Sequence, residues 1–417
     1  MLQPAPVAHK SLADYTHLTG RSLVEEVREL ASELEGLRVL HLSATAFGGG
    51  VAEILYTLVP LMKDVGIDVE WQVMLGREEF YNVTKQLHNA LQGDPHDLTP
   101  EQWQVYAKYN ELNSREIEQD WDVIIVHDPQ PAAIRELVPE RAKRWIWRCH
   151  IDLSEPNPTA IERLVPLIQG YDDALFHMER YVPHGLREGT RLDGAPEVHI
   201  VPPAIDPLSP KNMRFSPEDA AFVSDQFGFD VDRPLLCQVS RFDPWKDPIG
   251  VIDAYRLVHE QRPDTQLALV GSMATDDPEG WDFFNQTVAY ADGDPDIHIL
   301  NNFNNVGAIE VNAFQSQADV MIQKSTREGF GLTVSEALWK SRPFLGGDVG
   351  GIPLQVRDGE TGYLVSSPKQ CAERSLELLA DPELGQRLGR AGKEHVRTSF
   401  LTPRLLRDWL RIFSTSS

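Results

Sequence analysis

Apolar and polar positions along the chain follow two alternating patterns. Short runs that are mostly apolar predict buried strands, whereas apolar residues spaced three and four positions apart predict amphipathic helices. In the first half of the chain, strands are expected at residues 38–43, 68–74, 122–127, 143–149, 173–177 and 197–201. Because these runs alternate with helical stretches, the pattern predicts an α/β fold with a parallel, doubly wound sheet.

The same alternation restarts after residues 201–210, where four prolines stiffen the chain and indicate a linker. Beyond it, strands are expected at residues 234–240, 266–271, 297–300, 319–323, 343–346 and 363–365. Two consecutive arrays of similar size predict two Rossmann-like domains rather than one large sheet. We expect these domains to span residues 1–205 and 206–399.

Three helical stretches complete this prediction. Residues 21–35 carry an apolar stripe that is typical of an amphipathic helix. Residues 85–120 are polar and helix-prone, and they are long for a crossover, so an inserted pair of helices is expected there. Residues 400–413 again show amphipathic spacing and predict a final helix.

Composition narrows the range of partners. The formal net charge of −24 argues against nucleic acid or an anionic membrane as the main partner. An anionic ligand would therefore need basic residues gathered at its site. The cysteines Cys149, Cys237 and Cys371 lie in or beside apolar segments, which predicts buried thiols in a reducing compartment. No apolar run approaches the length of a membrane span, so a cytoplasmic protein is expected.

The stretch from residue 318 to residue 340 combines a short apolar strand, a glycine-containing turn at Gly329 and Gly331, and a helix. Free backbone N–H groups and the positive end of the helix dipole favour an anion, most often a phosphate, at such a turn. Glu328 and Glu336 flank the turn and would repel phosphate, but carboxylates accept hydrogen bonds from sugar hydroxyls. The stretch thus favours a sugar nucleotide, and an ordinary packing turn is the alternative.

Two cations follow the first strand of the second domain. Arg241 offers a planar fork of donors and Lys246 a point charge, five residues further along the same loop. In so acidic a chain, they are candidates for phosphate binding beside the predicted turn. The alternative is a solvated basic loop, in which these cations pair with Asp243 and Asp247.

Polar residues also end two neighbouring strands of the first domain. Asp128 follows His127 at one strand end, while His150 and Asp152 follow the next strand. Ligands of parallel sheets bind beyond the carboxyl ends of the strands, so all these candidates are expected to line one cleft between the domains. A histidine at a strand end can equally be structural, and the role of Asp152 is left open.

The spacing Glu-x7-Glu around Gly-Phe-Gly-Leu resembles the signature of the retaining glycosyltransferases of family 4. That resemblance implies the GT-B fold, with two facing Rossmann-like domains and a C-terminal helix, here residues 400–417, that rejoins the first domain. Residues 47–55, 58–62, 126–130 and 300–305 resemble, more specifically, trehalose glycosyltransferring synthases. The resemblance covers nearly the whole chain.

The resemblance also implies roles for individual residues. Asp128 would hold the acceptor sugar, His150 and Glu328 the reacting donor sugar, and Glu336 the ribose. The diphosphate would be contacted by Arg241 and Lys246, which makes these two cations part of the catalytic set. Backbone groups would line the nucleotide-sugar site at Gly49, Gly50, Gly329, Phe330, Gly331, Leu332 and Thr333.

The function implied is reversible transfer of glucose from a nucleoside diphosphate glucose (UDP-, ADP- or GDP-glucose) to free glucose, which forms α,α-trehalose with retention. A retaining trehalose phosphorylase and a non-catalytic sugar-nucleotide-binding regulator are the alternatives. No metal and no obligatory cofactor are expected, and Asp292-Gly-Asp294-Pro-Asp296 is interpreted as a plain loop. The sequence leaves open the nucleotide base, the physiological direction and the formation of a homodimer.

Overall fold

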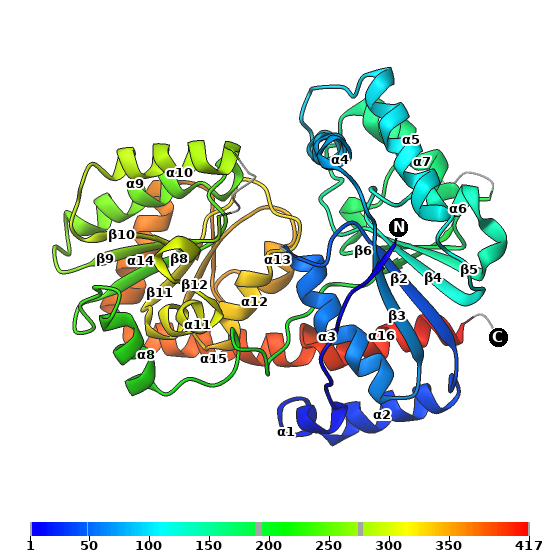
Figure 1. The fold of residues 1–417 in the computed structure, drawn as a ribbon. Coiled ribbons are helices and arrows are strands. Elements are labelled where there is room, and N and C mark those ends of the chain that lie inside the picture. The colour runs from blue at the N-terminus through cyan, green and yellow to red at the C-terminus, as the bar shows by residue number, and fades with distance from the viewer. Residues whose placement is uncertain (1, 48, 188–193, 274–277, 416–417) are drawn as a thin grey trace. The chain divides into compact units, whose positions relative to one another are not determined.

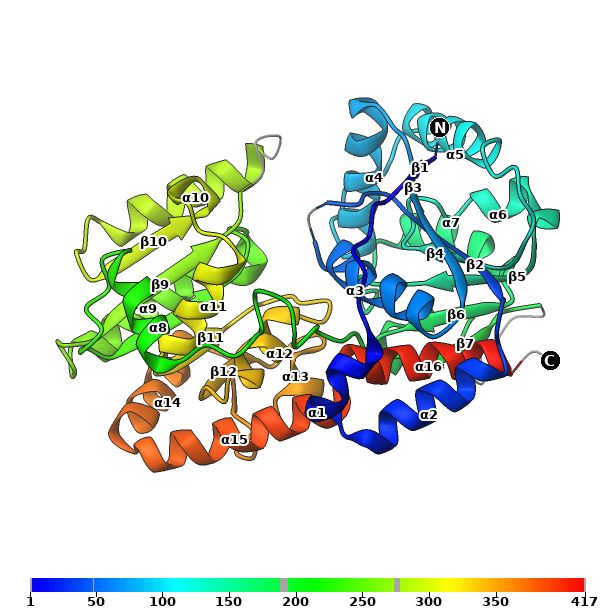
Figure 2. The ribbon, with the colours of Figure 1, turned by 60° about the horizontal axis from the view of Figure 1, so that its bottom comes forward.

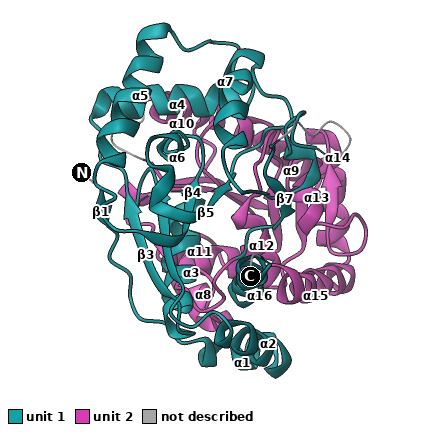
Figure 3. Ribbon diagram, turned by 90° about the vertical axis from the view of Figure 1, so that its right-hand side faces the viewer, with its two compact units in different colours: residues 1–204, 402–417 teal, residues 205–401 magenta. Residues whose placement is uncertain are grey.

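The structure is a computed structural model that describes residues 2–47, 49–187, 194–273 and 278–415. The chain divides into two compact units (Figure 3). Unit 1 comprises residues 1–204 and 402–417, and unit 2 comprises residues 205–401. No helix in the described ranges is long and apolar enough to cross a membrane.

Unit 1, shown with unit 2 in Figure 1, is built on one sheet with the strand order β1-β3-β2-β4-β5-β6-β7, whose strands are all labelled in Figure 2. All neighbouring strands pair in parallel except the short edge strand β1, which is antiparallel to β3. The chain order reverses beside β2, so the crevice of this sheet is expected at the carboxyl ends of β2 and β4. The strands are β1 (Gln3–Pro4), β2 (Arg38–Ser43), β3 (Asp68–Val73), β4 (Trp121–His127), β5 (Ala142–Arg148), β6 (Asp173–Phe176) and β7 (Glu197–Ile200).

Helices cover this sheet, and all but the last precede unit 2 in the chain. They are α1 (Thr16–Thr19), α2 (Arg21–Ser32), α3 (Gly50–Asp64), α4 (Glu78–Leu91), α5 (Pro100–Ser114), α6 (Ile134–Leu137), α7 (Pro158–Gln169) and α16 (Thr402–Ser414). The expected helical pair is present as α4 and α5, but it begins at Glu78 rather than at residue 85. Phe80 and Val83 extend the buried face of α4 toward its N-terminus, which explains the earlier start.

The last helix, α16, is part of unit 1 although it follows unit 2 in the sequence. It packs on α2 and α3 and runs beside α2 in Figure 2. Arg404 in its first turn is buried, and its guanidinium donates to the carbonyl oxygens of Pro202 and Pro203, both at 2.8 Å. These bonds fix the start of α16 to the end of the preceding unit 1 segment.

Unit 2 contains a second parallel sheet, with the strand order β10-β9-β8-β11-β12-β13. Its chain order reverses between β8 and β11, which again places the crevice at their carboxyl ends. The strands are β8 (Leu235–Val239), β9 (Gln266–Gly271), β10 (Ile297–Asn301), β11 (Val320–Gln323), β12 (Phe344–Gly347) and β13 (Tyr363–Val365). The helices are α8 (Pro217–Asp225), α9 (Pro248–His259), α10 (Pro278–Ala291), α11 (Ala308–Gln317), α12 (Leu332–Trp339), α13 (Ile352–Gln355), α14 (Pro368–Ala380) and α15 (Pro382–Ser399).

The parallel, doubly wound α/β architecture predicted from the sequence is confirmed. Every expected strand is present, and its bounds differ from the expected ones by at most one residue. Among the strands of the described residues, only β1 was not expected, because two residues in a proline-containing lead-in carry no strand pattern.

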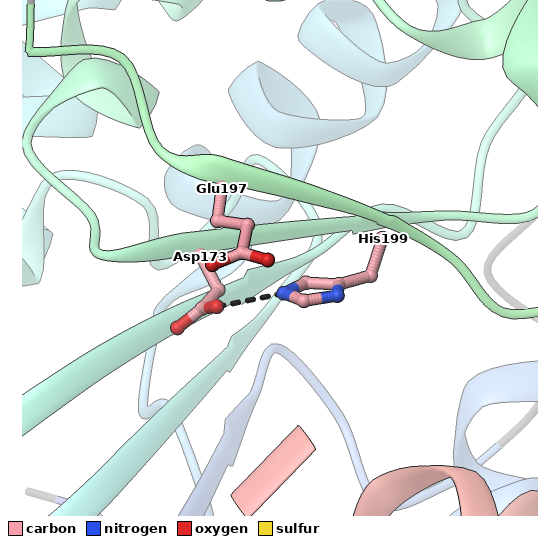
Figure 4. A group of neighbouring side chains, drawn as sticks. All are labelled: Asp173, Glu197 and His199. Atoms are coloured by element: carbon pink, nitrogen blue, oxygen red, sulfur yellow. Dashed lines mark hydrogen bonds and ion pairs between the residues drawn. The ribbon is translucent and has the colours of Figure 1, made fainter. Parts of the chain in front are cut away.

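An ion-pair cluster lies at the amino ends of β6 and β7, away from the crevice. Figure 4 shows Asp173, Glu197 and His199 with their side chains close enough together to hold a metal ion. However, Arg144 donates to both carboxylate oxygens of Asp173, at 2.6 and 2.7 Å, and His199 Nε2 lies 2.8 Å from Oδ1. Because the guanidinium already neutralises Asp173, we interpret the cluster as structural.

Replacing Asp173 with asparagine is expected to lower the free energy of unfolding by about 2–4 kcal/mol, because Arg144 is only 11% exposed and would lose its counter-charge. Asp68→Asn is the control, since Asp68 is 66% exposed and lies 3.9 Å from Arg38, and it should cost less than about 1 kcal/mol. Chemical denaturation measures both differences. A rise in melting temperature on adding Zn²⁺ would contradict the structural interpretation.

The loss of stability caused by Asp173→Asn should also depend on pH. Burial raises the pKa of this carboxyl, but the bonds from His199 and Arg144 outweigh burial and hold the pKa below its usual range. A depressed pKa adds stability above the unfolded value near 4, and this stability disappears as the pH falls through the folded pKa. The difference between the wild type and Asp173→Asn should therefore shrink in acid.

Candidate active site

Three neighbouring strands of unit 1 bring polar side chains to one edge of the sheet. His127 is the last residue of β4, and Asp128 follows it directly. His150 lies two residues beyond the end of β5, which pairs with β4. The structure brings Asp128 and His150 together, since the His150 amide N–H donates to Asp128 Oδ1 at 2.6 Å.

Asp128 is held in an unusual backbone conformation. Its φ of +66° lies in the left-handed region that non-glycine residues rarely adopt. Its N–H donates to the Arg148 carbonyl at 2.8 Å, and its own carbonyl accepts the indole N–H of Trp147 at 3.0 Å. Backbone strain that several bonds maintain is typical of functional sites.

The Asp128 carboxyl also titrates in an unusual range. Burial raises its pKa to about 7, although the bond from the His150 amide and the charge of Arg148 offset part of this rise. A carboxyl that is poised near neutral pH at a sheet crevice is a candidate for proton transfer or hydroxyl binding.

Two buried imidazoles, those of His127 and His41, continue from His150 into the interior of unit 1. His127 Nδ1 lies 2.9 Å from His150 Nε2, and His127 Nε2 lies 2.9 Å from Nδ1 of His41, in the middle of β2. Burial is the largest cause that lowers the pKa of each ring, to about 3 for His41 and well below the usual range for His127 and His150. All three rings are therefore neutral at pH 7.

The glycine-rich turn after β2 reaches the same edge of the sheet. Gly49 caps α3 with a φ of +88°, and Gly50 begins the helix, with both residues exposed. Gly48 lies outside the described residues. Asp152, whose role the sequence left open, accepts the Ser154 amide N–H at 2.8 Å and so stabilises a local turn.

In unit 2, two sequence-predicted residues form one ion pair. Lys246 follows β8 and Glu328 follows β11, and these two strands are neighbours. Lys246 Nζ lies 2.8 Å from Glu328 Oε2, and the side chains are 14% and 9% exposed. The Ser325 hydroxyl donates to the same oxygen at 3.2 Å, so the carboxylate is held at a fixed position.

The turn before α12 has the conformation that its glycine allows. Gly331 caps α12 with a φ of +78°, and an added Cβ would lie 3.1 Å from Glu328 Cγ. Leu332 and Thr333 begin the helix and are partly exposed, whereas Phe330 is buried and packs on Phe400. The N-terminal amides of α12 thus lie beside the carboxylate of the ion pair.

A second glycine-rich turn, at residues 346–351, has a packing role. A Cβ on Gly347 would lie 2.3 Å from the Ser325 carbonyl, and one on Gly351 would lie 2.7 Å from the Gly329 carbonyl. Only glycines therefore allow this turn to support the backbone of residues 325–330.

The remaining predicted residues of unit 2 differ in exposure. Arg241 is 66% exposed and lies 3.3 Å from Asp243, so it is not part of the Lys246 ion pair in this structure. The Glu336 side chain is fully buried, with Lys211 Nζ 3.3 Å from its Oε1. A ribose would reach Glu336 only after side chains that cover it have moved.

Sequence reasoning gave no chemical role to three buried polar residues that lie in or directly after the strands of the site. His41 and His127 were assigned to strands without a chemical role, and a histidine inside an apolar strand was the available signal. Lys324 directly follows β11, is 5% exposed and forms an ion pair with Asp247 at the N-terminus of α9. A lysine that continues an apolar strand indicates such a buried pair, because lysine is rarely buried without a partner.

The D-x-D segment at residues 292–296 is a loop, as expected. Asp294 accepts the Asp296 amide N–H at 3.0 Å within the turn. Asp296 forms a 2.7 Å ion pair with Arg233. These carboxylates are therefore engaged in local structure.

Two family models match consecutive parts of the chain. Residues 41–183 match the N-terminal domain of trehalose synthase, and residues 219–395 match the glycosyl transferases group 1. A trehalose synthase from Rubrobacter xylanophilus is 56% identical over 99% of both chains. A trehalose phosphorylase from Pleurotus pulmonarius is more distant, at 27% identity over 96% of this chain and 60% of its own.

Solved structures support the fold. An α,α-trehalose 6-phosphate synthase from Burkholderia multivorans superimposes with a TM-score of 0.70 at 15% identity, covering 91% of this chain and 99% of that one. At this identity the likeness concerns the fold, which is GT-B. The similarity to trehalose synthases over nearly the whole chain shows that the chain belongs to the trehalose synthase family and is a glycosyltransferase.

Proposed function

We propose that the protein transfers glucose, with retention and reversibly, from a nucleoside diphosphate glucose to free glucose, and so forms α,α-trehalose. The observation that carries the proposal is the Lys246–Glu328 pair beside the N-terminus of α12, at the reversal point of the unit 2 sheet. A cation, backbone donors and a carboxylate in one place suit a phosphate that is attached to a sugar. Close relatives that are named trehalose synthases support this choice.

Unit 2 would bind the donor. Charge develops on the diphosphate as it leaves, and Lys246, Arg241 and the amides of Leu332 and Thr333 would stabilise it. Arg241 can serve here because its exposed side chain is free to swing from Asp243 toward a phosphate. Glu328 would hold the reacting glucosyl ring, whose positive charge in the transition state favours a nearby carboxylate.

Unit 1 would bind the acceptor. Asp128 would accept a hydrogen bond from a glucose hydroxyl, and His150 would contact the donor sugar, while Gly49 and Gly50 allow the backbone to approach the ligand closely. The acceptor hydroxyl would attack from the side of the departing phosphate and give its proton to that phosphate, which leads to retention. Glu336 would bind the ribose, if Lys211 and its neighbours open a path to it.

We further propose that the enzyme works in the cytoplasm and that UDP-, ADP- or GDP-glucose serves as the donor. The three cysteines are buried free thiols, which suits a reducing compartment.

The reaction itself is the decisive test. Purified protein with glucose and each of the three nucleoside diphosphate glucoses is expected to form trehalose and to release the nucleoside diphosphate. With trehalose and the nucleoside diphosphate, it should form the sugar nucleotide. Chromatography of sugars and nucleotides measures both directions.

Inorganic phosphate provides the matched control. Trehalose and phosphate without nucleotide should yield no glucose 1-phosphate. Phosphate-dependent cleavage would replace the synthase assignment with a phosphorylase, and absence of turnover with every donor would favour a binding protein.

A further inference from the structure

Three imidazoles from three neighbouring strands form a hydrogen-bonded series in unit 1. His41 lies in β2, His127 ends β4, and His150 follows β5, and the two nitrogen–nitrogen distances are both 2.9 Å. The planes of adjacent rings are nearly parallel, with interplanar angles of 20° and 26°, as N–H···N bonds between ring edges require. His41 and His127 are buried, whereas His150 is partly exposed, so the series leads from the interior to the candidate site.

The protons in such a series are coupled. Each neutral imidazole carries one N–H, and each of the two hydrogen bonds requires one proton between its nitrogens. If His127 donates from Nδ1 to His150, its Nε2 must accept from His41, and the third proton lies on His150 Nδ1. In the opposite arrangement, the donor and the acceptor of both hydrogen bonds exchange roles, and the third proton lies on His41 Nε2.

The buried end of the series distinguishes these two arrangements. Among the described residues, His41 Nε2 is buried and has no hydrogen-bond partner. Its ring neighbour is Trp409, at a centroid distance of 6.1 Å, and an indole face is at most a weak acceptor. A buried N–H without an acceptor is rare in proteins, so the proton is disfavoured at this end and favoured at His150 Nδ1.

We propose that His41 and His127 are positioning residues that fix the tautomer of His150, so that its Nδ1 carries a hydrogen and donates to a substrate hydroxyl. The tautomer follows from the geometry of unit 1 alone, whereas the identity of the hydroxyl, on the donor sugar, rests on the proposed function. His150 Nδ1 then cannot accept a proton from the substrate. Nδ1 could accept a proton only if all three rings changed tautomer, which would place the His41 proton on Nε2, where it has no acceptor.

The tautomers can be measured directly. In full-length protein labelled with ¹⁵N-histidine, long-range ¹H–¹⁵N spectra at pH 7.5 are expected to show His41, His127 and His150 all protonated at Nδ1. Free histidine side chains in water favour the Nε2-protonated form, so the expected pattern is distinctive. Nε2 protonation of His150 in the wild type would overturn the proposal, whatever the activity of the protein.

Variants at His127 connect the tautomer with catalysis. His127→Ala allows water, which donates and accepts equally, to reach His150 Nε2, and Nε2-protonated His150 should then appear in the spectrum. His127→Asn is the matched variant, because its amide N–H₂ can still donate to His150 and should preserve the Nδ1 form. The kcat should fall about tenfold in the alanine variant and recover in the asparagine variant, with little change in the KM for free glucose.

The experiments test the tautomer of His150 and its donation to the substrate separately. If the tautomers are as expected but kcat is unchanged in His127→Ala, donation from His150 to the substrate is wrong. If the wild type forms no trehalose, the proposed function is wrong, while the spectrum still tests the positioning of His150. Equal loss of kcat in both His127 variants, with the Nδ1 form kept in His127→Asn, would also contradict a role through the tautomer.

Discussion

Replacing Asp128 with asparagine is expected to lower trehalose formation by about 100-fold or more while making the protein more stable at alkaline pH. Asparagine keeps an oxygen for the His150 amide and tolerates the left-handed φ of +66°. It cannot, however, accept a hydrogen bond from a substrate hydroxyl as strongly as a carboxylate does. Steady-state kinetics with glucose as the varied substrate would measure the loss.

The stability change follows from the raised pKa of Asp128, which burial brings to about 7. The unfolded value lies near 3.9, so the folded state binds the proton more tightly, and stability falls as the pH rises from about 4 to 7. Above pH 7 the cost of ionising Asp128 is fully present, with an upper limit of about 4 kcal/mol. Asp128→Asn avoids this cost, so its gain in melting temperature should be larger at pH 8 than at pH 5.

Asp128→Ala separates the two effects. Alanine loses the bond from the His150 amide and disfavours a positive φ, so this variant should be less stable than Asp128→Asn at both pH values. An asparagine variant with wild-type turnover would rule out Asp128 as the acceptor-binding carboxylate. A stability gain that is equal at pH 5 and pH 8 would contradict the raised pKa.

The second large effect is expected for Lys246→Ala. This change removes a charge-assisted contact to the donor and leaves Glu328, 9% exposed, without its ion-pair partner. We expect kcat/KM for the nucleoside diphosphate glucose to fall by about 10- to 100-fold, with a weaker affinity for the free nucleoside diphosphate. Donor kinetics and calorimetric titration with the diphosphate measure these quantities.

The double variant Lys246→Ala/Glu328→Gln shows how much of the stability lost in each single variant is due to the broken ion pair. Because both changes affect one ion pair, their effects on stability should be less than additive. Lys369→Ala is the control in unit 2, since Lys369 is 81% exposed and lies 3.9 Å from Glu373. Unchanged donor kinetics in Lys246→Ala would exclude this lysine from phosphate binding.

The sheets could be predicted because apolar runs buried on both faces leave a strong signal in the sequence. The runs at residues 122–127 and 266–271, for example, match β4 and β9 to within one residue. The start of α4 was harder to place, because Phe80 and Val83 continue its buried face but nothing in the sequence shows that the helix already begins at Glu78. Element type follows from periodicity, whereas a helix boundary depends on packing that the sequence alone does not reveal.

The chemical types at the candidate site were predictable, but their partners were not. Lys246 and Glu328 are far apart in sequence, and their contact depends on β8 lying beside β11 rather than only beside β9. The His41–His127–His150 series depends in the same way on the order of β2, β4 and β5. The complete burial of Glu336 follows from the packing of α12, which its position in a motif does not indicate.

The return of α16 to unit 1 has a consequence for how the protein is made. The ribosome must synthesise all of residues 205–401 before the helix that covers α2 and α3 exists. Trp409, Leu405 and Leu406 on α16 are buried in the finished protein, so their binding surface stays exposed to water during that interval. Domains usually fold in the order in which they are translated. Here the unit that begins first is completed last, so the surface of unit 1 that α16 covers stays open to water while unit 2 is being made.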